Sequence, residues 1–206
     1  MPDIRRAGLV DDFERPDENP AAFPWTHGGF NPGNMRIESG VFKPDNTDCT
    51  WYYDDPTKVF NADCEIWGMT HDVADLTEAW RIGLLDDSGN GYLVVVIAGI
   101  GTGNWQLREY TGGTFVQIDL QSEQFIPHAG NMIMMRIVDD HVETWYGLEP
   151  TFDSWTKVND VVDTTWRNNL RPWLGASSDD GTGPNWEEFG AGQLRKLPQI
   201  YRRPNE

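Results

Sequence analysis

A run of short apolar segments separated by turn residues is the feature that most limits the fold of this chain. Six segments follow one another between residues 78 and 147: EAWRIGLLD, GYLVVVIAG, NWQLREYT, GTFVQIDL, GNMIMMRIVD and HVETWYG. Gly, Asn or Asp bounds each of them, which is typical of antiparallel strands in a meander. GYLVVVIAG is apolar at both alternations, as expected for a strand buried between two layers. We therefore predict an all-β fold of two packed antiparallel sheets with little helix.

Length and charge narrow the class of protein. A chain of 206 residues without an internal repeat suits one core, so we expect a lead at 1–8, one domain at 9–195 and a basic arm at 196–206. Acidic residues number 33 against 16 basic ones, and the net charge of −17 opposes binding to nucleic acid or anionic lipid. No apolar run approaches the roughly 20 residues of a membrane span, and residues 1–6 lack the apolar segment of a secretory signal. We expect a soluble, unexported protein with no nucleic-acid partner and no membrane insertion.

The two cysteines, Cys49 and Cys64, lie on either side of a turn sequence at 55–58 with proline in its second position. A hairpin closed by this turn would place the cysteines opposite each other. Adjacent strands bring Cα atoms close enough for a disulfide, but a chain made without export keeps its thiols reduced. A reduced, buried pair is the favoured interpretation, and the bonded pair stays open.

The order of several segments resembles a concanavalin A-like, laminin G-like jelly roll from about residue 9 to residue 195. These segments are LVDDFERPDENP, FPWTHGGFNPGNMRIESGVFKP, FNADCEIWG, YLVVVIAGIGTGNWQLREYTGGTFVQI, NMIMMRIVDDHVETWYG and LRPWLGASSDDGTGPNWEEFGAGQL. In that family an initial D-x-F strand lies beside a terminal D/E-x-F strand. The resemblance therefore implies that Phe13 and Phe189 lie on neighbouring strands. The D-D-F-x-R-P-D opening is similar to domains carried by bacteriophage minor tail and other virion proteins, which implies a structural role in a virion.

Five carboxylates surround Phe13 at the start of the pattern: Asp11, Asp12, Glu14, Asp17 and Glu18. Jelly-roll glycoside hydrolases of the laminarinase type need an E-x-D-x-x-E strand, because alternate residues must face one cleft. This sequence lacks that spacing, and it also lacks the G-x-S-x-G, H-E-x-x-H and P-loop motifs. We predict that the protein is not an enzyme and that the carboxylates are solvated ends of an edge strand, which discourage aggregation.

Metal binding has little support. His27, His71, His128 and His141 each lie beside Gly, Asp or Pro in predicted exposed turns, without a second ligand at fixed spacing. The loops LDDSGNGY and SSDDGTGPNW offer oxygen ligands for calcium, but their residues are also those of hairpin turns, and the EF-hand spacing is absent. We predict no cofactor and leave calcium as the alternative.

Recognition is the remaining role for the aromatic residues. Alternation in 132–147 assigns Ile133, Met135 and Ile137, and then Val142, Thr144 and Tyr146, to the core. The predicted binding surface for glycan or protein consists of Arg108, Tyr110, Arg136, Glu143 and Trp145, and Trp and Arg often carry binding energy. The alternative is that these aromatics are core, because a register shift of one residue reverses every face.

The basic arm is predicted to pack on another surface. Its apolar residues would be wasted in solvent, and a short cationic segment suits docking on an acidic neighbour. The predicted interface residues of the arm are Leu197, Ile200, Tyr201, Arg202 and Arg203.

Two classes of function stay open. In the first, the chain is a non-enzymatic virion protein of the minor tail or tail tip, made in the host cytoplasm. It docks on other virion proteins in a symmetric multi-copy assembly and contacts host surface carbohydrate. In the second, it is a carbohydrate-binding module. A capsid decoration protein is a further alternative within the first class.

Overall fold

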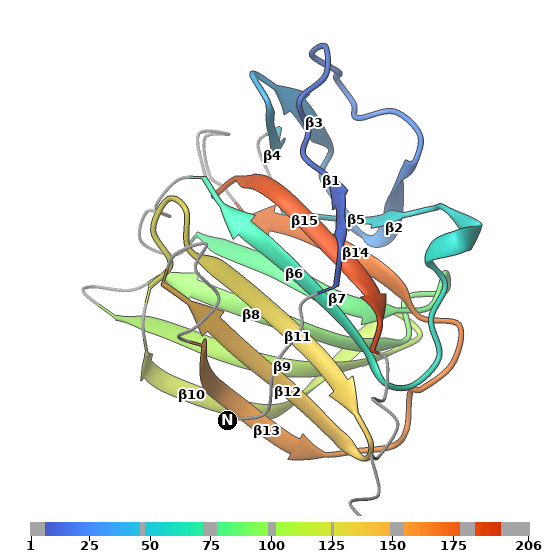
Figure 1. The fold of residues 1–206 in the computed structure, drawn as a ribbon, viewed down its shortest axis with the longest axis vertical. Helices are drawn as coiled ribbons and strands as arrows, with labels where there is room; N and C mark the ends of the chain where they lie inside the picture. The colour runs from blue at the N-terminus through green and yellow to red at the C-terminus, as the bar shows by residue number, and fades with distance from the viewer. Residues whose placement is uncertain are drawn as a thin grey trace, which may run out of the picture.

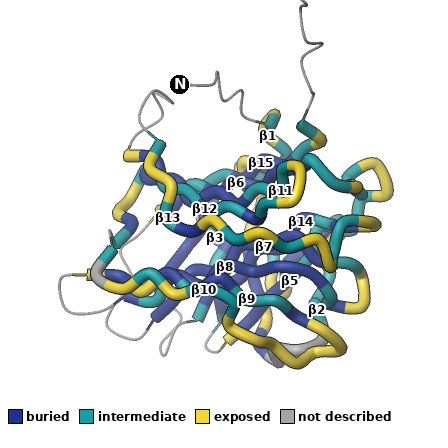
Figure 2. Tube along the Cα trace, turned by 90° about the horizontal axis from the view of Figure 1, so that it is seen from below, coloured by how far each residue is buried: buried dark blue, intermediate teal, exposed yellow. Residues whose placement is uncertain are grey.

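Two antiparallel sheets packed face to face make up the structure (Figures 1 and 2). The computed structural model describes residues 7–45, 48–71, 78–98, 102–124, 126–148, 155–177 and 184–194. In those ranges the only helical element is the 3-10 turn η1 (Pro56–Lys58). The predicted all-β, two-sheet architecture is confirmed. No helix among the described residues has the length and apolar character needed to cross a membrane.

Sheet A has the spatial order β13-β12-β11-β6-β15-β4-β3, with β1 beside β15. Its strands are β1 (Leu9–Asp11), β3 (Met35–Glu38), β4 (Val41–Pro44), β6 (Cys64–Thr70), β11 (Met132–Val138), β12 (His141–Gly147), β13 (Trp155–Val162) and β15 (Trp186–Gln193). Sheet B has the order β10-β9-β8-β7-β14-β5-β2. Its strands are β2 (Trp25–Pro32), β5 (Cys49–Tyr53), β7 (Ala79–Leu85), β8 (Gly91–Ala98), β9 (Gly103–Thr111), β10 (Thr114–Gln124) and β14 (Arg171–Ser177).

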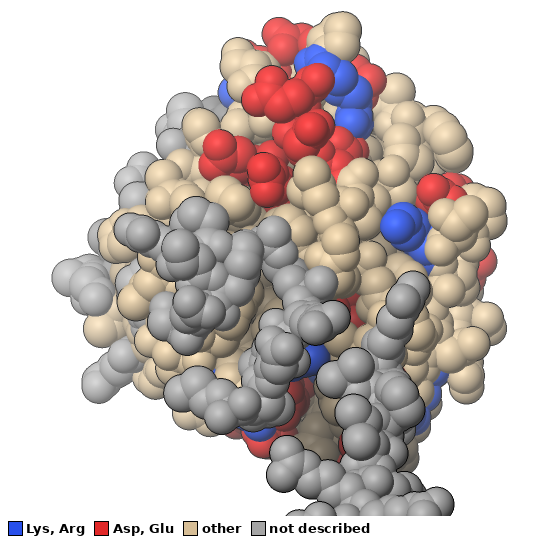
Figure 3. All heavy atoms as spheres, in the orientation of Figure 1, with Lys and Arg blue, Asp and Glu red and all other residues tan. Residues whose placement is uncertain are grey.

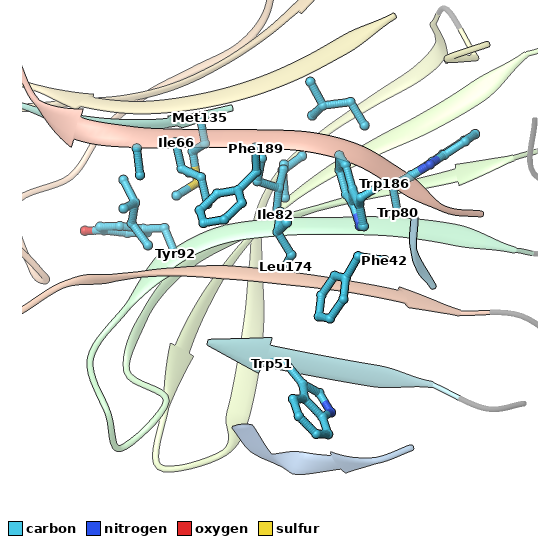
Figure 4. Close-up of a cluster of buried hydrophobic side chains, with 14 of the residues drawn as sticks. Phe42, Trp51, Ile66, Trp80, Ile82, Tyr92, Met135, Leu174, Trp186 and Phe189 are labelled. Carbon is cyan, nitrogen blue, oxygen red and sulfur yellow. The ribbon is translucent and has the colours of Figure 1, made fainter. Parts of the chain in front are cut away.

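The core lies between the inner faces of the two sheets (Figure 4). Ile66, Met135 and Phe189 from sheet A meet Ile82 and Leu174 from sheet B, and all five are fully buried. Hydrogen bonds also join the layers; for example, the indole Nε1 of Trp186 on β15 donates to the carbonyl of Gly175 on β14 at 3.0 Å. Burial of each such side chain contributes about 1.5–3 kcal/mol to the stability of the folded state. The side chains packed between the sheets therefore supply most of the hydrophobic stabilisation.

The alternation predicted for β11 and β12 is confirmed. Ile133, Met135, Ile137 and Val142 belong to the core cluster, with Tyr146 packed against it. The strands pair antiparallel with Arg136 opposite Glu143 and with Met134 opposite Trp145. The side chains of Met134, Arg136, Glu143 and Trp145 therefore lie on the outer face of sheet A.

The two acidic-Phe segments lie side by side, as predicted. β1 pairs antiparallel with β15, with Asp11 opposite Phe189. The rings of Phe13 and Phe189 are both fully buried, with centroids 6.2 Å apart. The ends of the sheet pattern thus meet in one aromatic cluster, which also includes Trp25 and Phe42.

Asp11 corrects the prediction that all the opening carboxylates are solvated. It is only 8% exposed and accepts hydrogen bonds from the backbone N–H of Phe13 at 2.9 Å and from the Trp25 indole at 2.9 Å. Arg15 Nη1 lies 2.8 Å from each of its oxygens. The hydrogen bond from the Phe13 N–H to Asp11 holds Phe13 at a φ of 54°, in the left-handed region that is uncommon for residues other than glycine. Asp11 is therefore a structural residue, whereas Asp12 and Glu14 are exposed.

The cysteine hairpin predicted from the turn sequence is wrong. Cys49 lies in β5 of sheet B and Cys64 in β6 of sheet A, so the chain crosses between sheets at this point. Asp55 caps η1 by accepting the Thr57 N–H at 2.8 Å. Through this turn the chain passes from β5 in sheet B to β6 in sheet A. Both thiols are free and buried, in line with the favoured reduced form, and burial raises the pKa of each to about 12.

Candidate functional site

The five residues predicted to share one surface lie on opposite faces of the sandwich. Arg136, Glu143 and Trp145 lie on the outer face of sheet A, whereas Arg108 and Tyr110 belong to β9 of sheet B. The prediction of a single surface is therefore wrong. Alternation tells which residues of a strand point inward, but it does not tell to which sheet the strand belongs. The outer face of sheet A and the outer face of sheet B each carry part of the predicted set.

The outer face of sheet A carries a ladder of paired charges. Arg136 Nε lies 3.1 Å from Glu65 Oε2, and Lys157 Nζ donates to Glu143 at 2.6 Å and to Asp160 at 2.8 Å. Opposite charges on neighbouring strands stabilise a sheet by direct cross-strand contact. These charged groups are therefore engaged with one another within the face.

Trp145 takes part in the same network. Its indole Nε1 donates to Glu143 at 3.1 Å, and Lys157 Nζ lies 5.1 Å from the centre of its ring. A cation over an aromatic ring is a favourable contact. This arrangement explains how a half-buried tryptophan is held on the outer face.

A histidine extends this ladder at its end. His141 Nδ1 lies 2.5 Å from Asp160 Oδ1, and this hydrogen bond raises the pKa of His141. His141 and His27 lie in strands, so the prediction that all four histidines lie in turns is wrong for these two, while His71 and His128 are exposed. Among the described residues, no cluster of three or more His, Cys, Asp or Glu side chains is arranged to hold a metal ion.

The outer face of sheet B has an apolar floor. Leu85, Leu93, Val95, Tyr110 and Trp173 form a hydrophobic cluster of buried residues, separate from the main core. Tyr110 is only 4% exposed, so it supports this face from below and does not offer its ring to a ligand. The interpretation of β8 as a strand buried on both sides is confirmed, because Val94 and Val96 belong to the main core and Leu93 and Val95 to this floor.

Arg108 lies above this floor at the β10 edge of the sheet. Its Nε and Nη2 both donate to Gln106 Oε1, at 3.1 and 2.6 Å. Its guanidinium carbon lies 4.1 Å from the centre of the Phe115 ring, which in turn is 5.5 Å from the ring of Tyr110. Gln117 lies directly opposite Arg108 on β10. We call Gln106, Arg108, Tyr110, Phe115 and Gln117 the Arg108 platform.

The Arg108 platform is accessible. Phe115 is 46% exposed and Gln117 is also exposed, while Arg108 and Gln106 are half-buried. An exposed ring, an arginine and two amide side chains on one sheet face are the groups that fix polar ligands in binding sites. Sequence reasoning found Arg108 but missed Phe115 and Gln117, although GTFVQIDL placed them two residues apart on one strand.

Another aromatic pair lies at the far side of the same face. The rings of Tyr52 and Trp173 are 5.0 Å apart, and the guanidinium carbon of Arg171 is 5.9 Å from the Tyr52 ring. Arg171 Nη1 donates to Asp54 at 2.9 Å. Burial, followed by the charge of Asp54, raises the pKa of Tyr52. Asp54 neutralises the charge of Arg171. This corner therefore differs from the Arg108 platform, whose arginine pairs with no carboxylate among the described residues.

A hollow lined by Asp17, Glu18, Asn19, Arg36, Ile37 and Glu38 lies beside β3. Acidic side chains gather at this end of the molecule, with basic ones next to them (Figure 3). Arg36 donates to Glu38 at 2.9 Å and to Asp45 at 2.5 Å, and Lys43 lies 2.6 Å from Glu38. The hydrogen bond from Lys43 lowers the pKa of Glu38. These charges neutralise one another locally, so the hollow is a weaker candidate.

Of the two loops that offer oxygen ligands for calcium, the structure describes LDDSGNGY in full and SSDDGTGPNW only in part. In the turn at 86–90, Asp86 accepts the backbone N–H of Ser88 at 2.9 Å and that of Asn90 at 2.8 Å, so its oxygens organise a hairpin. Most of SSDDGTGPNW lies outside the described residues, as do the arm residues Leu197, Ile200, Tyr201, Arg202 and Arg203. Calcium binding therefore stays an open alternative to the predicted absence of a cofactor, and the docking of the arm stays a prediction.

No protein-family model matches this sequence, and no curated protein sequence matches it. Solved structures do match. The exoplasmic/lumenal domain of VIP36, in its Ca2+/Man3GlcNAc-bound form, gives a TM-score of 0.62 at 11% identity, covering 84% of this chain and 85% of that one. The carbohydrate-binding module CBM66 from Bacillus subtilis gives 0.53 at 13% identity, covering 77% and 93%.

A glycoside hydrolase also matches. The GH43B protein of a Bacteroides ovatus xyloglucan locus gives a TM-score of 0.57 at 12% identity, and the match covers 94% of this chain but only 42% of that one. Identities this low establish a fold and no more. The chain has the concanavalin A-like jelly-roll fold, as the resemblance in the sequence implied. This is the fold that the matched lectin-type and carbohydrate-binding structures also adopt.

Proposed function

We propose that this protein is a carbohydrate-binding jelly roll that recognises a glycan on the outer face of sheet B. The observation that carries the proposal is the likeness to VIP36 and CBM66 over most of both chains, since one structure holds a mannose-containing glycan and the other is a carbohydrate-binding module. Fold alone does not determine function. The proposal therefore depends on a surface with suitable chemistry.

The Arg108 platform has that chemistry. Phe115 is 46% exposed, and the part of its ring that Arg108 leaves uncovered can meet the apolar side of a sugar ring. Gln117 supplies an amide donor and acceptor for hydroxyl groups, and Gln106 supplies its amide NH2, because its oxygen accepts from Arg108. The buried floor beneath, with Leu93 and Tyr110, holds these side chains on a rigid sheet. A site on strands needs little ordering when the ligand binds, which favours affinity.

The outer face of sheet A is the less favoured surface, because its charged side chains pair with one another and Trp145 is less exposed than Phe115. A glycan array, followed by calorimetry with the best glycan, tests the choice. We expect Phe115→Ala with Gln117→Ala to weaken binding at least tenfold, because truncation at a binding centre often costs about 2 kcal/mol or more. The matched control is Trp145→Ala on the opposite face, which should bind like the parent. If the control loses binding and the double variant keeps it, the site is wrong.

The platform, as proposed, binds sugar without cleaving it. The two-carboxylate arrangement that glycoside hydrolysis requires is missing from the platform, whose members are two glutamines, an arginine and two aromatic residues. Because the fold also matches part of a GH43 chain, release of reducing ends from array-positive glycans should be measured directly. Release that one Asp or Glu substitution abolishes would contradict a binding-only role.

A virion role is the second candidate. Its support is the D-D-F-x-R-P-D opening, which is similar to domains of phage minor tail proteins. In that role the chain would be made in the host cytoplasm, join a symmetric multi-copy tail or capsid assembly, and use the same platform to contact host carbohydrate. Immunogold labelling of purified particles with an antibody to this chain tests it. Absence of the chain from particles would refute the virion role and leave carbohydrate binding standing.

A further inference from the structure

We propose that the Arg108 platform selects acidic sugars by binding the carboxylate of a uronic acid to the Arg108 guanidinium. This inference rests on the proposed carbohydrate-binding function and adds the class of ligand. It follows from three features of Arg108: the lack of a carboxylate partner among the described residues, the donors that remain, and the rigid placement of the guanidinium.

Arg108 differs from most other arginines that the structure describes. The described arginines that pair with a carboxylate are Arg15, Arg36, Arg81, Arg136 and Arg171. Within the described ranges, Arg108 and Arg167 form no such pair. The chain has 33 acidic residues against 16 basic ones, so partners are abundant. An arginine left without a carboxylate on an exposed platform is available to an external one.

Its donors are only partly used. A guanidinium has five N–H groups in a planar fork. The bonds to Gln106 Oε1 engage Nε and one N–H of Nη2, and within the described part of the chain no acceptor is found for the others. The other N–H of Nη2 and both on Nη1 thus remain for a ligand. A carboxylate is the anion that matches neighbouring N–H groups of this fork in a bidentate contact.

The guanidinium is also held in place. Phe115 supports its plane at 4.1 Å, and Gln106 fixes the edge that carries Nε. A side chain that is already ordered loses little conformational entropy on binding, so more of the interaction appears as affinity. Lysine at this position would keep the charge but lose both the fork and its stacking.

The acidic body of the protein does not prevent this contact. At physiological ionic strength charges are screened over about 8 Å, so the groups next to the ligand dominate. The cross-strand neighbours of Arg108 are Leu93 and Gln117, which are neutral. Glu109, the adjacent acid on β9, accepts the Trp166 indole N–H at 3.0 Å. The immediate environment of Arg108 on this face is therefore neutral or apolar.

The test is an array that carries uronic-acid oligosaccharides, each beside the neutral oligosaccharide in which a CH2OH group replaces the carboxylate, together with hexaglutamate. The best acidic binder and its neutral counterpart are then measured by calorimetry. We expect the parent protein to favour the acidic sugar about tenfold or more, because charge-assisted hydrogen bonds are stronger than neutral ones. Arg108→Gln should abolish this preference, so that the acidic and the neutral sugar bind with affinities within about twofold of each other.

Two further variants sharpen the test. Arg167→Gln removes the other described arginine without a carboxylate partner and should keep the preference, so it controls for net charge. Arg108→Lys should give an intermediate preference, and it replaces Arg108→Gln if the latter does not fold as judged by circular dichroism.

The possible failures are distinguishable. Equal binding of acidic and neutral sugars by the parent protein overturns this inference and leaves the proposed function standing. No binding of any sugar overturns both. A preference that survives Arg108→Gln, or hexaglutamate binding as tight as that of the acidic sugar, overturns the inference.

Discussion

Replacing Asp11 by alanine should destabilise the protein strongly, because this single carboxylate satisfies buried donors from two segments. The variant leaves the Phe13 N–H and the Trp25 indole N–H without their acceptor. Each buried donor left unpaired costs about 1–3 kcal/mol. The guanidinium of Arg15 adds little, because its side chain is 27% exposed and reaches water. The expected loss in the free energy of unfolding is therefore about 2–6 kcal/mol.

Calorimetry measures this effect as a change in the melting temperature. For a chain of this size, 1 kcal/mol corresponds to about 2–4 °C, so we expect a decrease of roughly 4–24 °C. Asp12→Ala is the matched control, because Asp12 is exposed and, among the described residues, accepts a hydrogen bond from the Glu14 N–H at 3.1 Å. If the two variants melt within about 2 °C of each other, the Asp11 carboxylate is ordinary solvated surface and the structural role given to it here is wrong.

Three further outcomes follow from local geometry and burial. Gly190→Ala should lower the free energy of unfolding, measured by urea titration, by about 1–3 kcal/mol, because an added Cβ would meet the Trp67 ring at 2.3 Å. Gly8→Ala is the control and should have little effect, because the space around Gly8 is open. Equal effects of the two substitutions would contradict this prediction. Both cysteines should resist a thiol reagent at pH 8 until the protein unfolds, because burial raises the pKa of each thiol to about 12; fast labelling of the folded protein would refute it. Asp160→Asn should lower the pKa of His141, followed by NMR, toward its ordinary value near 6.5, since their hydrogen bond raises it. The stabilisation from this bond is complete below that ordinary value and is lost as the pH rises through the raised pKa; an unchanged titration would exclude the contact in solution.

Much of the fold could be predicted from the sequence because hydrophobic alternation is a local signal. Ile133, Met135 and Ile137 point inward, and a one-residue shift would move all three to the outer face of the sheet. The family resemblance supplied the contact between Phe13 and Phe189, which lie far apart in the sequence. Length and pattern alone would not have paired these two ends.

Sheet membership was not predictable in the same way. The turn at 55–58 has residues that suit either a hairpin or a crossover, and the structure uses it for a crossover that separates Cys49 from Cys64. Arg108 and Arg136 were likewise both predicted to point outward, but outward from different sheets. Local periodicity cannot distinguish such cases, because long-range pairing decides them. The partner of a side chain is equally hidden, so Phe115 beneath Arg108 emerged only from the structure.

The most direct test of the central claim is an NMR titration of the labelled protein with the glycan that binds best on an array. We expect the backbone amide shifts to change most on β8, β9 and β10, around Gln106, Arg108 and Phe115, with little change on β11 and β12. Shift changes confined to the residues around Arg136 and Trp145 on sheet A, or no changes at saturating glycan, would contradict carbohydrate recognition by the outer face of sheet B.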